Sequence, residues 1–418
     1  MTPEGPGPAA LARAAVPAAI VGLASAALLR AIDEVAHALD HAWWHALPEA
    51  LGLDPEARWW AVLILTLTGA LVGLVLWKAP GHGGHDTATV ELIAPPLPLR
   101  ALPGVAAALI LGLAGGVSLG PEGPVIMIAA TFTVLAYRRW LPAVPTMAAL
   151  TISAAGMLGA MLGTPVAAAL ALTGALGGDR EGHLWDRLFA PLVAASTGAI
   201  GFHLLGGGTW TGDLPAYEPA WIDLLTASLV AVVGAAAGVA AAAAFTPAHR
   251  LFRRLRHPLA YVTLGGLLLG LLGALGGPIT MFKGAAETIA LLDGRDSYTV
   301  AALVGIVAIK LIAIVIAGAS GFRGGRIFPA LFTGVAVGLL GHALIPGMSV
   351  TLAVGVGVMG VVLAVSRDGW FAIFGGMLIA GEIAILPIVC VAVLPAWLVV
   401  TRAPHMLVRG PATVQTEP

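Results

Sequence analysis

A carboxylate set among glycines and prolines is the best candidate in this chain for a chemically active residue. Glu122 lies in the stretch Gly120-Pro121-Glu122-Gly123-Pro124, directly before an apolar run. An ionisable side chain at membrane depth costs at least ~2.5 kcal/mol and indicates a function by default. The ionised carboxylate would compete with an anion for backbone amides, and the protonated form would lose that attraction. We therefore predict that Glu122 is a gate; the alternative is a charge that only caps a helix.

A second glycine-rich stretch follows about 201 residues later. Residues 115–124 have the sequence GGVSLGPEGP and residues 318–329 have GASGFRGGRIFP, and an apolar helix is expected to resume after each. A glycine-rich segment that opens a helix leaves N–H groups directed at one spot, where the helix dipole adds partial positive charge. We predict that both breaks form an anion site, to which Arg323 and Arg326 add fixed charge. The alternative is that glycine and proline only kink two helices for packing.

The composition identifies the class of protein that positions these breaks. Of 418 residues, 59% are hydrophobic and 10% are charged, whereas a soluble domain carries about 25% charged residues. The mean hydropathy of +0.95 excludes a soluble enzyme, a disordered chain and a nucleic-acid binder. A net charge of −1 provides no global field, so selectivity must come from local groups. The single cysteine, Cys390, excludes an intrachain disulfide and a thiolate metal site.

Apolar runs recur along the chain and predict an all-α, polytopic membrane protein. A full span needs about 20 residues, so the shorter runs bounded by glycine or proline indicate broken and re-entrant helices, which point to a transport site. We interpret the N-terminal run as a membrane helix and not as a cleaved signal. The runs are 60–77, 101–119, 125–136, 145–176, 188–206, 222–245, 259–277, 299–319, 327–345, 349–365 and 370–400.

The two similar breaks predict an internal repeat. The predicted halves are residues 1–210 and 211–418, with no appended soluble domain. The basic stretch from His249 to His257 lies past the midpoint and predicts a cytoplasmic loop by the positive-inside rule. Lys310 lies in an apolar run before the second break, and we assign it no role.

The two breaks also resemble family signatures. Residues 120–124 are similar to the G-[K/R]-E-G-P signature of the ClC chloride channel and transporter family, and residues 324–329 resemble its G-G-x-F-x-P signature. The resemblance extends to the stretch from Leu102 to Pro124, to Gly163-Thr164-Pro165 and to Leu386-Pro387. It implies a homodimer of independent pores, each built from two inverted halves whose helix N-termini meet at the anion.

Departures from the family pattern decide how the anion would be held. Gly83 stands where the family has an anion-binding serine, and the family's tyrosine falls near Met406. Ala175 replaces the inner proton-relay glutamate of the exchangers, and Pro121 replaces a basic residue. The resemblance thus leaves backbone amides and one arginine to hold the anion. Besides the Glu122 gate, the predicted anion-binding residues are Gly120, Gly123, Gly83, Gly84, Gly324, Gly325, Arg326, Ile327 and Phe328.

Two local features have several interpretations. His82, His85 and Asp86 could ligate zinc, could form a polar turn with Asp86 as a helix N-cap, or could line the inner mouth and titrate near neutral pH. We prefer the polar turn and predict no metal site. Arg326 either deepens the anion site or pairs with a carboxylate such as Asp368 or Glu382.

The predicted function is a ClC-type chloride channel with a glutamate gate, in the cell inner membrane. The first alternative is a proton-coupled chloride or fluoride antiporter, which Ala175 disfavours. An intramembrane enzyme is an alternative of another class, but no nucleophile with a spaced base is present, so we assign no catalytic residue. The expected partners are chloride or another small anion, the lipid bilayer and a second copy of the chain. We expect no cofactor and no nucleic acid.

Overall fold

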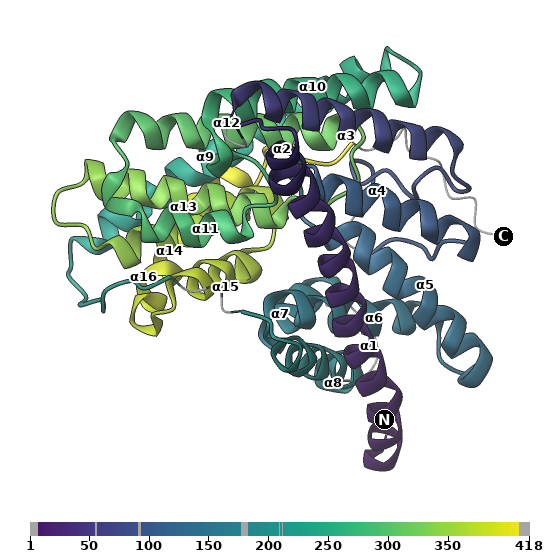
Figure 1. Ribbon diagram of the computed structural model, residues 1–418. Helices are drawn as coiled ribbons and strands as arrows, with labels where there is room; N and C mark the ends of the chain where they lie inside the picture. The colour runs from purple at the N-terminus through teal and green to yellow at the C-terminus, as the bar shows by residue number, and fades with distance from the viewer. Residues whose placement is uncertain are drawn as a thin grey trace.

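The computed structural model describes residues 7–54, 57–90, 93–176, 183–208, 210 and 212–408, and within them every regular element is helical (Figure 1). The α-helices are α1 Pro8–His41, α2 Leu47–Ala50, α3 Arg58–Lys78, α4 Leu102–Ala114, α5 Glu122–Trp140, α6 Thr146–Leu162, α7 Pro165–Leu176, α8 Leu184–Leu204, α9 Asp223–Arg253, α10 Pro258–Gly276, α11 Ala285–Asp293, α12 Val300–Ala319, α13 Ile327–Leu344, α14 Val350–Ser366, α15 Gly369–Ala380 and α16 Leu386–Val400. A π-helical turn, Ala42–Ala46, joins α1 to α2, and short 3₁₀ turns lie at Leu99–Ala101, Pro278–Thr280, Arg295–Ser297 and Ile383–Ile385.

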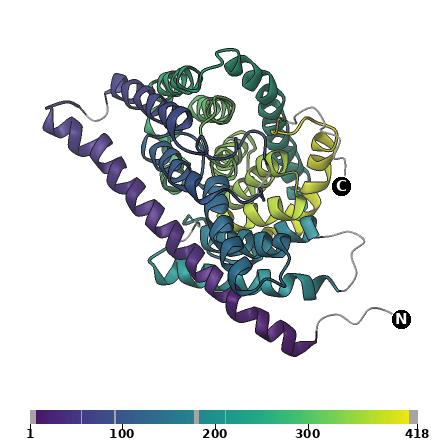
Figure 2. The same cartoon turned by 90° about the vertical axis from the view of Figure 1, so that its right-hand side faces the viewer.

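Seven helical segments of the described chain are long and apolar enough to cross a membrane. They lie beside shorter apolar helices, among them α6, α14 and α15, that are too short for a full span. The first segment includes α1, which lies along the outside of the helical bundle (Figure 2). The prediction of an all-helical, polytopic membrane protein is confirmed.

Two of the apolar runs each contain two helices. The run 145–176 divides into α6 and α7 at Gly163, and the run 370–400 divides after α15 at Gly381. Gly163 has a φ of +69° and Gly381 a φ of +66°, so the chain turns through a left-handed conformation that glycine adopts without steric cost. Hydrophobicity alone did not reveal these ends because the residues on both sides are apolar.

Close contact between helix backbones holds the scaffold that carries the breaks. A Cβ atom added at Gly69 of α3 would lie 2.6 Å from the carbonyl oxygen of Val262 on α10. A Cβ atom at Gly338 of α13 would lie 2.5 Å from the Cα of Val354 on α14. Small residues let membrane helices approach this closely, and the resulting packing replaces the hydrophobic driving force that lipid does not provide.

Two local predictions need correction. The stretch from His249 to Arg253 is the end of α9, so only residues 254–257 form the turn before α10. The first part of the basic run is helical because its arginines complement the negative, C-terminal end of the α9 dipole. Asp86 lies in a turn, and the next helical element begins only at Leu99, so Asp86 is not an N-cap. The division into halves at residue 210 stays a prediction.

Candidate functional site

The two glycine-rich breaks lie side by side. The N–H of Gly120 donates to the carbonyl oxygen of Gly325 at 2.8 Å, and the N–H of Gly325 donates back to Gly120 at 2.7 Å. This antiparallel bridge joins the end of one break to the end of the other, directly before α5 and α13 begin. A Cβ atom added at Gly325 would lie 2.1 Å from Oε2 of Glu122, so a larger residue there would force this carboxylate to move.

Glu122 is the first residue of α5 and is buried, with 2% of its surface exposed. Its Oε1 accepts a hydrogen bond from the backbone N–H of Phe328 at 2.9 Å. Phe328 is the second residue of α13, so the carboxylate accepts a hydrogen bond from one of the N–H groups that have no partner within that helix. The other oxygen, Oε2, is buried and has no hydrogen-bond partner among the described residues. A buried acceptor without a partner is costly, and the hydrogen bond from Phe328 is one that a competing anion could replace.

Gly83 and Gly84 lie in a loop that touches the second break. Both have positive φ, at +67° and +74°. The carbonyl oxygen of Gly83 accepts a hydrogen bond from Nε of Arg323 at 3.0 Å, and the N–H of Gly84 donates to Gly81 at 2.9 Å. The Gly84 amide is thus already paired within its own turn. Of the predicted amide donors in this loop, Gly83 remains the better candidate.

The same loop supplies a hydroxyl that the sequence did not predict. Thr87 is buried, and its Oγ1 donates to the carbonyl oxygen of Phe322 at 3.3 Å. A Cβ atom added at Gly123 would lie 3.3 Å from the methyl carbon of Thr87, so the threonine lies against the first turn of α5 as well. The family pattern has a serine where this chain has Gly83, and Thr87 is the next hydroxyl residue along the loop.

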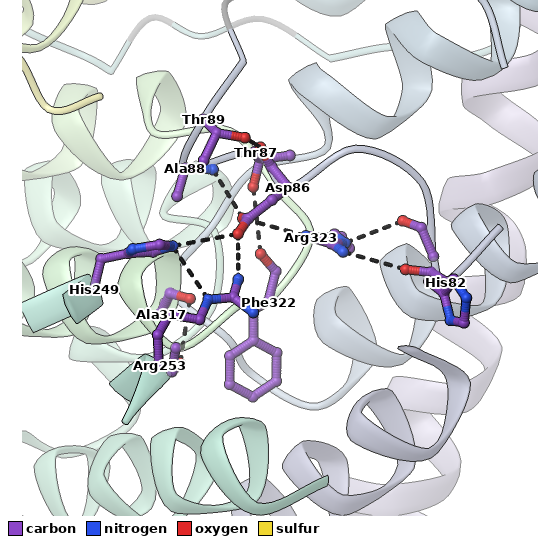
Figure 3. A network of polar contacts seen from close by, with 12 residues as sticks. His82, Asp86, Thr87, Ala88, Thr89, His249, Arg253, Ala317, Phe322 and Arg323 are labelled. Atoms are coloured by element: carbon purple, nitrogen blue, oxygen red, sulfur yellow. Dashed lines mark hydrogen bonds and ion pairs between the residues drawn. The ribbon is translucent and has the colours of Figure 1, made fainter. Parts of the chain in front are cut away.

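Asp86 is the centre of an ion-pair network (Figure 3). Its carboxylate pairs with Arg253, with Arg323 at 3.2 Å and with His249 at 3.4 Å, and it accepts the N–H of Ala88 at 3.1 Å. Burial acts to raise the pKa of Asp86, but the hydrogen bond from His249 and the charges of Arg323 and Arg253 outweigh it, so this pKa is lowered. The network connects the loop at residue 86, the end of α9 and the second break.

The zinc interpretation of this region does not fit the geometry. Asp86 is engaged by arginine, and Nδ1 of His82 lies 3.0 Å from the carbonyl oxygen of Leu76. Across the described ranges, no three His, Cys, Asp or Glu side chains are grouped to hold a metal ion. His85 is adjacent to Asp86 in sequence, and its Nε2 is buried without a hydrogen-bond partner among the described residues.

Arg326 connects the start of α13 to the C-terminal segment. Its Nη1 donates to the carbonyl oxygen of Met406, and its guanidinium lies 5.2 Å from the ring centroid of Phe245. Asp368 and Glu382 instead accept backbone N–H groups of their own helical starts, Phe371 and Ala384. The alternative in which Arg326 pairs with either of these carboxylates is therefore not what the structure shows. The charge of Arg326 acts on Glu122 and Asp86.

The substitution Arg326→Gln tests whether this charge deepens the anion site. We expect flux at low anion concentration to fall severalfold, because two unit charges 4 Å apart interact by ~4 kcal/mol at an effective dielectric of 20 before desolvation is subtracted. Flux at saturating anion should change less. Flux measured against anion concentration, beside the melting temperature, checks this. An unchanged half-saturation concentration together with a lower melting temperature would show that Arg326 only stabilises the fold, through its hydrogen bond to Met406.

Ala175 belongs to α7, but its side chain lies outside the described residues. The other residues of the predicted anion site lie in the two breaks and at the starts of the helices that follow them. Gly120 and Gly325 form the bridge, Gly324 packs on Leu119, Gly123 faces Thr87, and Ile327 and Phe328 open α13.

The chain is similar to known proteins over most of its length. A family model described as "Voltage gated chloride channel" matches residues 64–401. A relative from Escherichia coli O139:H28 (strain E24377A / ETEC), named "Putative ion-transport protein YfeO", is 40% identical over 397 residues, which is 95% of each chain. A relative of the same name from Shigella boydii serotype 4 (strain Sb227) matches to the same extent.

Solved structures share the fold. A slow cyanobacterial Cl⁻/H⁺ antiporter superposes with a TM-score of 0.78 at 20% identity, covering 93% of this chain and 94% of its own. A CLC-type fluoride/proton antiporter superposes with a TM-score of 0.72 at 19% identity, covering 96% and 98%. These matches confirm the resemblance noted in the two signatures. The chain belongs to the voltage-gated chloride channel (ClC) family, a family of membrane transport proteins and not of enzymes.

Proposed function

We propose that this multi-pass membrane protein is a passive chloride channel gated by Glu122. Anion transport follows from its family. The observation that carries the proposed gate is the 2.9 Å hydrogen bond from the N–H of Phe328 to Oε1 of Glu122. An anion entering the site competes with this carboxylate for the amides at the start of α13, and protonation of Glu122 releases them.

The orientation proposed here follows from two clusters at opposite ends of the same helices. Arg58 at the start of α3 and Gly273 near the end of α10 line a cavity of about 1080 Å³. At the other end, Lys78 ends α3, and the ring of the preceding Trp77 lies 5.0 Å from the ring of His257 in the basic turn before α10. We place the basic end in the cytoplasm and the cavity on the outer side of the inner membrane. We also propose a homodimer, from the family resemblance.

A proton-coupled antiporter is the second candidate. It is supported by the two solved structures described as Cl⁻/H⁺ and fluoride/proton antiporters, which share the fold. Ala175 opposes it, because the residue at the relay position of the exchangers is not an acid.

Anion efflux from liposomes that contain the purified protein, with parallel proton recording, separates the two candidates. We expect efflux of chloride that moves no protons uphill, because the relay acid is absent. Nitrate and fluoride, tested in the same way, identify the anion that is preferred. Proton uptake in a fixed ratio to chloride would contradict the channel and establish an antiporter.

A further inference from the structure

A large cavity lies beside the first break. Its volume is about 1080 Å³, and it is lined by α1, the π-helical turn, α3, the end of α10 and the start of α11. Its walls carry charges of both signs, including Asp33 and Lys283, which pair at 3.2 Å, and Glu287. Leu113, near the end of α4, also lines the cavity. The cavity therefore reaches the end of the helix from which the first break begins.

Two aromatic rings lie between this cavity and the first break. Trp44 and Phe282 both line the cavity, and their rings meet edge to face with centroids 5.5 Å apart. A Cβ atom added at Gly116 would lie 3.2 Å from the Trp44 ring and 3.7 Å from the Phe282 ring. Nε1 of Trp44 donates to the carbonyl oxygen of Ala114 at 2.9 Å, which fixes this ring at the end of α4. Both rings thus cover the backbone of the break that leads to Glu122.

Phe282 is held in a backbone conformation that bulky residues avoid. Its φ is +55°, in the left-handed region, and such conformations persist only where the surroundings over-determine them. The N–H of Phe282 donates to the carbonyl oxygen of Gly116 at 2.9 Å. Its own carbonyl oxygen accepts from Nζ of Lys310 at 2.8 Å. Bonds on both sides of the residue therefore keep its ring over the break.

Lys310 is the buried anchor of this arrangement. It is fully buried, and its ammonium donates to the carbonyl oxygens of Thr280 at 3.2 Å and Met281 at 2.6 Å as well as to Phe282. A buried cation in a membrane protein is costly and marks a functional group by default. Three carbonyl acceptors use all three of its donors. The lysine thereby fixes three successive residues, the last of which carries the ring.

We propose that Trp44 and Phe282 form an aromatic constriction between the cavity and the anion site, and that Lys310 is the positioning residue that holds Phe282 in it. This inference rests on the proposed anion conduction through Glu122. Apolar constrictions limit the passage of hydrated ions, while the positive edges of aromatic rings favour an anion over a cation. The constriction sets how fast an anion passes between the cavity and the gate.

Thiol labelling tests the constriction without requiring transport. In a Cys390→Ser background, Glu122→Cys places a single thiol behind the two rings, and Ser118→Cys does so in the same break should the first variant not fold. An anionic methanethiosulfonate reagent is added from the cavity side. We expect Phe282→Gly, which keeps the positive φ but removes the ring, to speed labelling by about tenfold or more. Arg256→Gly, at a residue with a φ of +56° in the turn after α9, is the matched control and should change nothing.

Lys310→Met is expected to speed labelling as well, because the ring loses its anchor. Combined with Phe282→Gly it should add nothing further, since both changes act on the same ring. Equal labelling rates with and without the Phe282 ring would overturn the constriction, and additive effects would overturn the positioning role of Lys310. Absence of anion flux through the parent protein would instead refute the proposed function. The labelling rates do not depend on flux, so the two failures can be told apart.

Discussion

Glu122→Gln is expected to raise anion flux by about tenfold or more at neutral pH and to abolish its dependence on pH. In the parent protein the carboxylate holds the Phe328 amide at 2.9 Å. A hydrogen bond to a charged group is worth about 1.5–3 kcal/mol, so its loss shifts the competition with an anion by roughly tenfold or more. Glutamine has the shape of the protonated carboxyl but carries no charge that titrates. Efflux from liposomes between pH 5 and pH 8 measures both effects.

The matched control is Glu287→Gln. Glu287 lies on α11, lines the cavity and accepts a hydrogen bond from the N–H of Gly284 at 2.9 Å, whereas Glu122 accepts one from Phe328 of α13. Burial raises the pKa of Glu287. We expect this variant to keep the pH profile of the parent. A Glu122→Gln protein with the parent's pH profile would show that Glu122 is not the gate.

Asp86→Ala is expected to lower stability by about 3 kcal/mol, since removal of one partner from a buried ion pair leaves the other charges uncompensated. Arg253 and Arg323 both lose their carboxylate, and the side chain of Asp86 is only 17% exposed. The melting temperature in detergent measures the loss. Glu34→Ala is the control, because the pair of Glu34 with Arg30 is about half exposed on both sides and such pairs contribute little.

The pH dependence of this loss has a defined direction. The pKa of Asp86 is lowered in the folded protein, so its stabilisation is complete above the unfolded carboxyl pKa of about 3.9 and declines as the pH falls below it. The difference in melting temperature between the parent and Asp86→Ala should therefore be full at pH 7 and shrink below about pH 4. A difference that grows on acidification would contradict the ion-pair account.

The local features of the site were predictable from the sequence, since they depend on residues close together in the chain. Glycine and proline around residue 120 and residue 325 predicted two broken helices, and the carboxylate in the first break predicted the gate that we propose. The start of α5 at Glu122 and of α13 at Ile327 follows from the same stretches. Most apolar runs likewise became helices with ends near those expected.

Contacts between distant segments were not predictable in this way. Arg253 meets Asp86 across 167 residues, and Thr87 meets Phe322 across 235 residues. Lys310 received no role because its three carbonyl acceptors lie in a turn far from it in the chain. A single sequence contains no periodicity that pairs such residues, so tertiary packing alone decides which of them reach the site.

The central claim is that the Glu122 carboxylate and the transported anion compete for the amides at the start of α13. Isothermal titration of the detergent-solubilised protein with chloride, at pH 5 and pH 8, measures this competition directly. The account predicts that the parent binds chloride more tightly at pH 5, where Glu122 is more often protonated, and that Glu122→Gln binds equally tightly at both. Chloride affinity in Glu122→Gln that keeps the parent's dependence on pH would contradict it.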